Sequence, residues 1–184
     1  MKLVILDRDG VINQDSDAYI KTPDEWQPLP GSLEAIARLT HAGYRVAVAT
    51  NQAGIARGLF DLDALNQIHT KMTSMVHEAG GHLDLILFCP HADDRAPCRK
   101  PNPGMYREIA ERLRVSLRDV PAIGDTLNDI ETAQAVSARP ILVRTGKGLR
   151  TLASGDPPGV VVYDDLAAAV SALLAEDPVE AAAR

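Results

Sequence analysis

The fold of this chain is decided by residues 3–10, LVILDRDG, in which a short apolar run ends directly in two carboxylates and a glycine. An uninterrupted apolar run of this length is typical of a parallel strand that is buried on both faces. Side chains alternate along a strand, so Asp7 and Asp9 are expected to face the same way, with Arg8 turned aside. Because ligands bind outside the carboxyl ends of such strands, both acids are candidate site residues. The alternative is a solvated turn, for which Asp and Gly are both favoured.

The rest of the chain alternates between strand-like and helix-like patterns. Strands are expected near residues 2–7, 44–50, 84–88, 120–124, 140–144 and 160–163, and helices near 32–42, 62–79, 104–114, 128–136 and 166–174. Such alternation predicts an α/β fold built on a doubly wound, Rossmann-like parallel sheet. Polar groups suited to phosphate chemistry stand beside three of the later segments: Thr50-Asn51-Gln52, Arg99-Lys100 and Asp125.

Length and charge limit the classes of partner. A chain of 184 residues is expected to form a single domain, here residues 1–175, and the alanine-rich, acidic end at 176–184 is expected to fray. The net charge of -6 argues against a nucleic acid or an anionic membrane surface as the main partner. No apolar run suits a signal peptide or a membrane span, so a cytoplasmic location is expected. A compact acidic single domain can stand alone, so a monomer is expected.

Four motifs in order carry a resemblance to a known family. The chain resembles the haloacid dehalogenase (HAD) superfamily of phosphohydrolases in four motifs, which are Asp7-x-Asp9, then Thr50, then Lys100, and last Asp125 together with Asp129. Within it, the strings TNQAGIARG at 50–58, CPH at 89–91 and CRKPNPGM at 98–105 are similar to the D-glycero-D-manno-heptose 1,7-bisphosphate 7-phosphatases. The histidinol-phosphate phosphatases are near relatives. The short inserts between motifs imply a capless HAD-like fold whose site is covered by loops.

The resemblance implies phosphoryl transfer through an aspartyl-phosphate intermediate. Asp7 would be the nucleophile and Asp9 the general acid and base, which requires a raised pKa for Asp9 because free Asp titrates near 3.9. Magnesium would bind the Asp7 carboxylate, the Asp9 backbone carbonyl and Asp125. Thr50 and Lys100 would stabilise the transferring phosphoryl group, whereas the alternatives are an ordinary strand end and a solvated loop cation.

Several further residues are candidates with two interpretations each. Asp129 could orient metal-bound waters or cap a helix. Asn51 and Gln52 are assigned to substrate binding by the resemblance, and Arg57 and Arg99 would favour a substrate with a second phosphate. The candidates for sugar hydroxyls are Asp15, Ser16 and Asp17, on what could also be a plain polar loop. Related heptose phosphatases often carry lysine where this chain has Thr126, so a contact to the second phosphate is missing or supplied elsewhere.

The two cysteines raise the question of zinc. Cys89, His91 and Cys98 resemble a zinc loop, but Ala96 stands where the fourth ligand belongs, and structural zinc is almost always four-coordinate. A disulfide between the cysteines is not expected in the cytoplasm. Either the loop holds no metal, or the shell is completed by Asp93, Asp94, His82 or water.

The motifs and the resemblance together predict a magnesium-dependent sugar bisphosphate phosphatase acting on D-glycero-D-manno-heptose 1,7-bisphosphate in nucleotide-heptose and lipopolysaccharide core synthesis. Its partner would be this small-molecule substrate. The same-class alternative is a histidinol-phosphate phosphatase. A phosphosugar-binding protein without activity is the alternative of another class, although pure binding would not require both a nucleophile and an acid/base.

Overall fold

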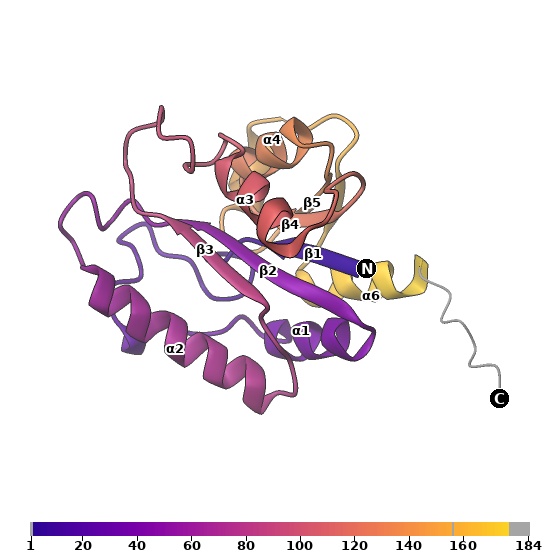
Figure 1. The fold of residues 1–184 in the computed structure, drawn as a ribbon, viewed down its shortest axis with the longest axis horizontal. Helices are drawn as coiled ribbons and strands as arrows, with labels where there is room; N and C mark the ends of the chain where they lie inside the picture. The colour runs from indigo at the N-terminus through magenta and orange to yellow at the C-terminus, as the bar shows by residue number, and fades with distance from the viewer. Residues whose placement is uncertain (1, 156, 177–184) are drawn as a thin grey trace.

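The computed structural model describes residues 2–155 and 157–176, which form a six-stranded parallel sheet. Figure 1 shows helices on both sides of this sheet. The strands are β1 (Lys2–Leu6), β2 (Tyr44–Asn51), β3 (Leu85–Cys89), β4 (Pro121–Gly124), β5 (Arg139–Val143) and β6 (Val161–Tyr163). The α-helices are α1 (Ser32–His41), α2 (Leu62–Glu78), α3 (Gly104–Leu113), α4 (Leu127–Ala135), α5 (Gly148–Ala153) and α6 (Leu166–Glu176), and a 3-10 turn, η1, covers Pro23–Glu25.

The expected order of strands and helices is confirmed, with ends that shift by at most two residues. Two elements, η1 and α5, were not predicted from the sequence. Each is too short to show the apolar repeat of a helix in the sequence. Helix α5 begins close to the candidate site, so this omission affects the functional interpretation below.

The strand order is β3-β2-β1-β4-β5-β6, and every pair of neighbours is parallel. The chain moves outward from β1 to β3 and then crosses back to β4 on the other side of β1. The Asp7 N–H donates to the Ile123 carbonyl at 2.9 Å and so extends the pairing of β1 with β4. Ligand sites form at such a reversal of strand order, which lies between the carboxyl ends of β1 and β4.

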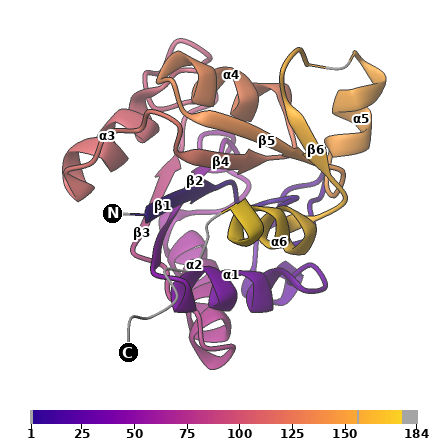
Figure 2. The same ribbon diagram turned by 90° about the vertical axis from the view of Figure 1, so that its right-hand side faces the viewer.

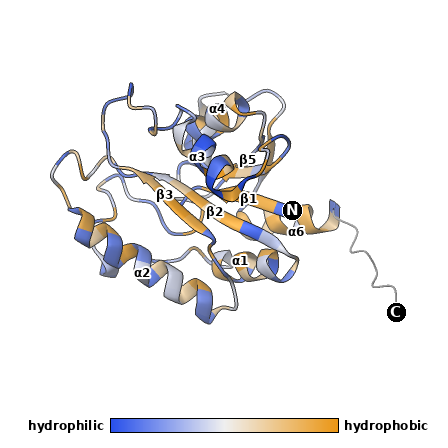
Figure 3. Ribbon diagram, in the orientation of Figure 1, coloured by the Kyte–Doolittle hydropathy of each residue, from blue (hydrophilic) through white to orange (hydrophobic). Residues whose placement is uncertain are grey.

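Strand β1 divides its side chains between two apolar layers, as its continuous apolar sequence requires. Val4 and Leu6 join the layer under α1, α2 and α6, whereas Leu3 and Ile5 join the layer under α3 and α4. The two helical layers flank the sheet in Figure 2, and the strands of the sheet are largely apolar in Figure 3. Burial on both faces leaves only the ends of the strands for polar chemistry.

The chain end differs in part from the expectation. Glu176, assigned above to a fraying tail, is the last residue of α6, and its carboxylate pairs with Arg139 at 2.6 Å. The rest of that tail, 177–184, lies outside the described residues. Within the described residues, no helix is both long enough and apolar enough to cross a bilayer.

Candidate active site

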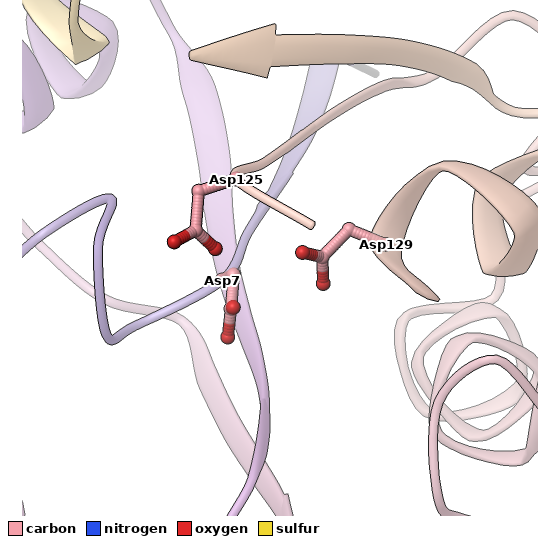
Figure 4. Close-up of side chains that lie close together, drawn as sticks. All are labelled: Asp7, Asp125 and Asp129. Carbon is pink, nitrogen blue, oxygen red and sulfur yellow. The ribbon is translucent and has the colours of Figure 1, made fainter. Parts of the chain in front are cut away.

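Three aspartates converge at the reversal of strand order (Figure 4). Asp7 follows β1, Asp125 follows β4 and Asp129 lies in the first turn of α4, and one oxygen from each lies within 4.8 Å of the others. Burial and the neighbouring carboxylates raise the pKa of both Asp7 and Asp125. The Asp125 Oδ1 atom is buried and has no hydrogen-bond partner within the described residues. An unpaired, buried carboxylate oxygen in such a cluster suits a hard divalent cation, so the residues fit the magnesium that the sequence predicts.

Two glycines let the backbone approach Asp125 closely. Gly10 has a φ of 82°, and a Cβ there would collide with Asp125 Oδ2. Gly146, at φ 57°, would make the same collision. Thr145 donates its hydroxyl to the Gly10 carbonyl at 2.6 Å, so the loops after β1 and β5 are joined over this carboxylate. The glycine after Asp9 therefore allows a close approach of two loops.

Lys100 is buried beside the aspartates. Its ammonium contacts Asp129 Oδ1 at 2.6 Å, the Ala49 carbonyl at 2.8 Å and Asp7 Oδ1 at 3.0 Å. Burial opposes the charge, but Asp129 and Asp7 raise the pKa of Lys100 above its usual range. The interpretation of Lys100 as a solvated loop cation is therefore wrong.

Asn51 holds the Lys100 backbone in place. Its Nδ2 donates to the Lys100 carbonyl at 3.0 Å, and its Oδ1 accepts from the Lys100 N–H at 3.0 Å. The sequence assigns Asn51 to substrate binding, and it does line the cavity. Its hydrogen bonds, however, position the loop that carries the lysine.

The surroundings of Asp9 contradict the raised pKa that the sequence analysis requires. Arg8 donates to Asp9 from Nε and Nη2 at 2.7–3.0 Å, and Asn13 and Gln52 each donate at 2.9 Å. Burial favours the neutral acid, but the Arg8 charge and these hydrogen bonds outweigh it and lower the pKa of Asp9. Among these donors Asp9 is thus a carboxylate.

Arg8 is fully buried, which sequence alternation did not reveal. It extends to the layer of α2, where Nη1 lies 3.2 Å from His69 Nε2. Since a guanidinium only donates, this imidazole nitrogen accepts and His69 is neutral. Burial and the Arg8 charge lower the pKa of His69 to about 3. Asp9 is therefore held by a buried chain of contacts that begins on α2.

Thr50 is buried at the end of β2 and shares a donor with Asp9. Gln52 Nε2 donates to Thr50 Oγ1 at 3.0 Å and to Asp9 Oδ2 at 2.9 Å. The Thr50 oxygen accepts that bond, so its own proton is free to be donated to a ligand oxygen. Gln52, assigned to substrate binding, thus also links two proposed catalytic side chains.

A polar cavity of about 260 Å³ opens over these groups. The structure brings most of the predicted residues to its lining: Asp7, Asp9, Asp15, Ser16, Asp17, Thr50, Asn51, Gln52, Arg99, Lys100 and Asp125. Arg57 is an exception, because it is not part of this lining. Its guanidinium lies 5.8 Å from the centre of the Tyr19 ring, and Tyr19 itself lines the cavity. The prediction of a direct substrate contact by Arg57 is not supported by this placement.

Lys147 also lines the cavity and was missed by sequence reasoning. Its backbone N–H donates to Asp125 Oδ2 at 2.7 Å, and its ammonium lies 3.1 Å from Asp15 Oδ2. It stands before the short helix α5, in a segment without a motif in the sequence. The sequence holds one signal for Lys147: it is a basic residue that follows shortly after a strand, and the carboxyl ends of the strands form the edge of the site.

Asp129 has one of the two roles left open by the sequence, the helix cap, and its role in orienting metal-bound waters stays a prediction. Its Oδ2 accepts from the Thr126 N–H at 3.0 Å and from the Thr126 hydroxyl at 2.6 Å, which caps α4. Its Oδ1 meets Lys100, as described above. Thr126 lines the cavity but commits its hydroxyl to this cap.

The cysteine loop differs from the expectation. Cys89 and Cys98, nine positions apart with Cα atoms at 5.5 Å, are joined in a disulfide, which was not expected from the sequence. The end of β3 and the return of the loop bring them together. Bonded sulfurs are not thiolate ligands, and among the described residues the metal-competent cluster is the three aspartates alone. The Cys89, His91 and Cys98 set does not fit zinc in this form.

Comparisons with known proteins agree with this geometry. The sequence profile of the family described as "HAD-hyrolase-like" matches residues 97–169. The D-glycero-beta-D-manno-heptose-1,7-bisphosphate 7-phosphatase of Pseudomonas aeruginosa is 57% identical over 94% of this chain and 97% of its own length. The enzyme of that name from Bordetella bronchiseptica is 57% identical over 96% of this chain and 99% of its own.

A solved structure extends the likeness to three dimensions. The crystal structure of D,D-heptose 1,7-bisphosphate phosphatase from B. bronchiseptica, complexed with magnesium and phosphate, has a TM-score of 0.93 and 57% identity. It covers 96% of this chain and all of the solved chain. With the fold, the order of motifs and the relatives in agreement, this chain belongs to the HAD-like family of D-glycero-beta-D-manno-heptose-1,7-bisphosphate 7-phosphatases.

Proposed function

We propose that this protein is a magnesium-dependent phosphatase that removes the 7-phosphate of D-glycero-β-D-manno-heptose 1,7-bisphosphate. The observation that carries the proposal is the convergence of Asp7, Asp125 and Lys100 at the carboxyl ends of β1 and β4. The names of the relatives support the substrate and its β anomer. The sheet and the cavity lie within residues 2–176, so we propose that one domain carries the function.

Asp7 acts as the nucleophile. Lys100, 3.0 Å from Asp7 Oδ1, favours the ionised carboxylate that must attack phosphorus. A bond forms between an Asp7 oxygen and phosphorus as the bond from phosphorus to the sugar oxygen breaks, and Asp9 gives a proton to that departing oxygen. Water then attacks the aspartyl phosphate, Asp9 takes its proton, and inorganic phosphate leaves with Asp7 restored.

The lowered pKa of Asp9 separates its role as base from its role as acid. As a carboxylate held by Arg8, Asn13 and Gln52, Asp9 is ready to act as the base in the second step. The first step needs its proton. An incoming phosphate places like charge near Asp9, which raises its pKa, so substrate binding itself promotes the protonated acid.

Charge on the phosphoryl group is stabilised by residues already in place. Lys100 is buried and pre-positioned by Asn51, and Thr50 offers a hydroxyl proton, so neither group needs to reorganise during the reaction. Asp7, Asp125 and the Asp9 backbone carbonyl would hold magnesium. Bound there, the ion would screen the repulsion between the anionic nucleophile and the anionic phosphate.

The loop before η1 supplies sugar contacts in this proposal. Asp15, Ser16 and Asp17 line the cavity with groups that can bind hydroxyls. Arg99 lines it as well, while its Nε donates to Asp94 at 2.9 Å and its Nη1 to the His91 carbonyl at 3.3 Å. The remaining nitrogen, Nη2, is available for a substrate phosphate.

Phosphate release from a substrate panel tests the proposal. The panel contains both anomers of heptose 1,7-bisphosphate, fructose 1,6-bisphosphate and histidinol phosphate, each with magnesium or EDTA, and D7N is the control. We expect fastest release from the β heptose bisphosphate, dependence on magnesium and no turnover by D7N. Faster release from histidinol phosphate would be consistent with the mechanism but would refute the proposed substrate. If no compound releases phosphate, a binding protein without activity is favoured.

A further inference from the structure

The basic groups of the cavity differ in how much of their hydrogen-bonding capacity is free. Three basic residues line it: Arg99, Lys100 and Lys147. An ammonium has three donors. Lys100 directs all three to Asp129, Ala49 and Asp7, so it has no donor left for a distant group of the substrate.

Lys147 has donors to spare. Its ammonium contacts one acceptor among the described residues, Asp15 Oδ2 at 3.1 Å, and its side chain is 37% exposed. A lysine side chain is ordinarily a charged ammonium at neutral pH, and here it has the Asp15 carboxylate beside it. Asp15 is fixed in turn, because its Oδ1 accepts from the Ser16 N–H at 2.8 Å. The ammonium is therefore charged, held at the cavity wall and able to bind an anion without releasing Asp15.

The backbone of Lys147 fixes the place from which this side chain extends. Its N–H is bonded to Asp125, one of the three clustered aspartates, and its side chain leads from there to the loop of Asp15. The loop after β5 therefore links the reacting end of the cavity to the part lined by the sugar-binding candidates. Arg99 comes from the loop after β3, on the other side of β1 in the strand order.

Charge gives a reason for a second cation. A sugar bisphosphate is highly anionic, and the lining already holds six carboxylates: Asp7, Asp9, Asp15, Asp17, Asp125 and Asp129. Lys100 serves the reacting phosphate. The phosphate that is not cleaved must be bound at another cation, or the surrounding acids would repel it.

We propose that the Lys147 ammonium binds the phosphate that is not cleaved and so makes the enzyme selective for bisphosphates over monophosphates. This inference rests on the proposed function. Lys147 acts here as a specificity-determining residue. Its backbone N–H, which any substitution except proline retains, still holds Asp125.

The test compares two substrates that differ only in that phosphate. Wild type, K147Q, K147R and R144Q are assayed with D-glycero-β-D-manno-heptose 1,7-bisphosphate and with the corresponding heptose 7-phosphate. Arg144 lies in the same loop after β5, pairs with Asp164 and is not part of the cavity lining. R144Q therefore removes one positive charge, as K147Q does, but outside the cavity. Each variant is first checked for an unchanged Tm.

We expect K147Q to lower kcat/KM for the bisphosphate about 10- to 100-fold, the effect of losing a charge-assisted hydrogen bond, with a loss of no more than about threefold for the monophosphate. The ratio of kcat/KM for the bisphosphate to kcat/KM for the monophosphate should stay close to the wild-type ratio in the other variants. We expect it within about threefold for K147R, which keeps the charge, and within about twofold for R144Q.

Equal losses on both substrates would overturn the inference and leave Lys147 as a support for Asp15. An unchanged ratio in K147Q would overturn it as well. If the wild type releases no phosphate from the bisphosphate, the proposed function fails and this inference fails with it, which the wild-type assay alone reveals.

Discussion

Single residues show how two aspartates in one short motif acquire opposite electrostatics. Asp7 is largely removed from water near Asp129 and Asp9, and its pKa is raised. Asp9, two positions later, is surrounded by donors from Arg8, Asn13 and Gln52, and its pKa is lowered. Environments that push the pKa values of two titratable groups apart are typical of sites with divided acid and base roles.

The acid role of Asp9 can be tested by the choice of leaving group. We expect D9N to lower kcat/KM for the heptose bisphosphate by about 10²–10⁴-fold, because its alkoxide leaving group requires a proton. The loss should be much smaller for p-nitrophenyl phosphate, whose leaving group departs as a stable anion. Steady-state kinetics with both substrates measure the difference, and equal losses would contradict an acid role.

At the scale of elements, helix α4 and the loop of Lys100 are joined through one side chain. Asp129 accepts from both polar groups of Thr126 at the start of α4 and also pairs with Lys100. The cap of the helix and the charge balance of the site thus share one carboxylate. Thr126, which differs from the lysine of related heptose phosphatases, serves this structural contact.

Removal of the cap should destabilise the protein. We expect T126A to lower the free energy of unfolding by about 1 kcal/mol, because the hydroxyl contact with Asp129 is lost. T126S keeps a hydroxyl and is the matched control. Urea denaturation monitored by circular dichroism measures both variants, and a serine variant as unstable as the alanine variant would refute the role of the hydroxyl.

At the scale of the whole molecule, the candidate metal site costs stability in the absence of the ion. Asp125 is buried, its pKa is raised, and its Oδ1 has no partner in the described residues, so its charge is unfavourable in the folded chain. A function-bearing site of this kind is typically less stable than the fold could achieve.

Thermal unfolding with and without magnesium tests this view. We expect D125N to raise the Tm in EDTA, because it removes a buried negative charge near Asp7 and Asp129. Magnesium at about 100 times its Kd should stabilise the wild type by about 2.7 kcal/mol and should have little effect on D125N. A lower Tm for D125N in EDTA, or equal stabilisation by magnesium, would contradict the prediction.

His69 links global stability to pH. Its pKa is about 3 in the folded chain and 6.5 as a free side chain, so the unfolded state binds the proton more strongly. Stability is thus present above pH 6.5 and is lost as the pH falls towards 3. We expect a loss of about 2 kcal/mol between pH 6.5 and 5 from this residue.

The measurement is the free energy of unfolding as a function of pH for the wild type and H69Q. Glutamine can still accept from Arg8 but does not titrate, so its curve should be flatter between pH 5 and 6.5. His77, exposed on the same helix, provides the control H77Q, which should follow the wild type. Parallel curves for the wild type and H69Q would disprove the assignment.

The amino-acid sequence alone was enough to predict the order of the strands and helices and to reveal the four motifs. Both are local properties: an apolar run such as 3–6 must be buried on two faces, and a motif depends on spacing along the chain. These features needed no knowledge of which segments meet. The alternation after β1 placed Arg8 apart from both acids, whereas its guanidinium bonds to Asp9.

Only the tertiary structure decided the electrostatics of the site. The lowered pKa of Asp9 depends on a buried Arg8 that reaches His69, 61 residues further along the chain. Loops that fold back over the sheet likewise produce three other contacts. These are Lys147 with Asp15, Arg57 with Tyr19, and Cys89 with Cys98. Charge and hydrogen bonding act through space over a few ångströms, so neighbours distant in sequence set them.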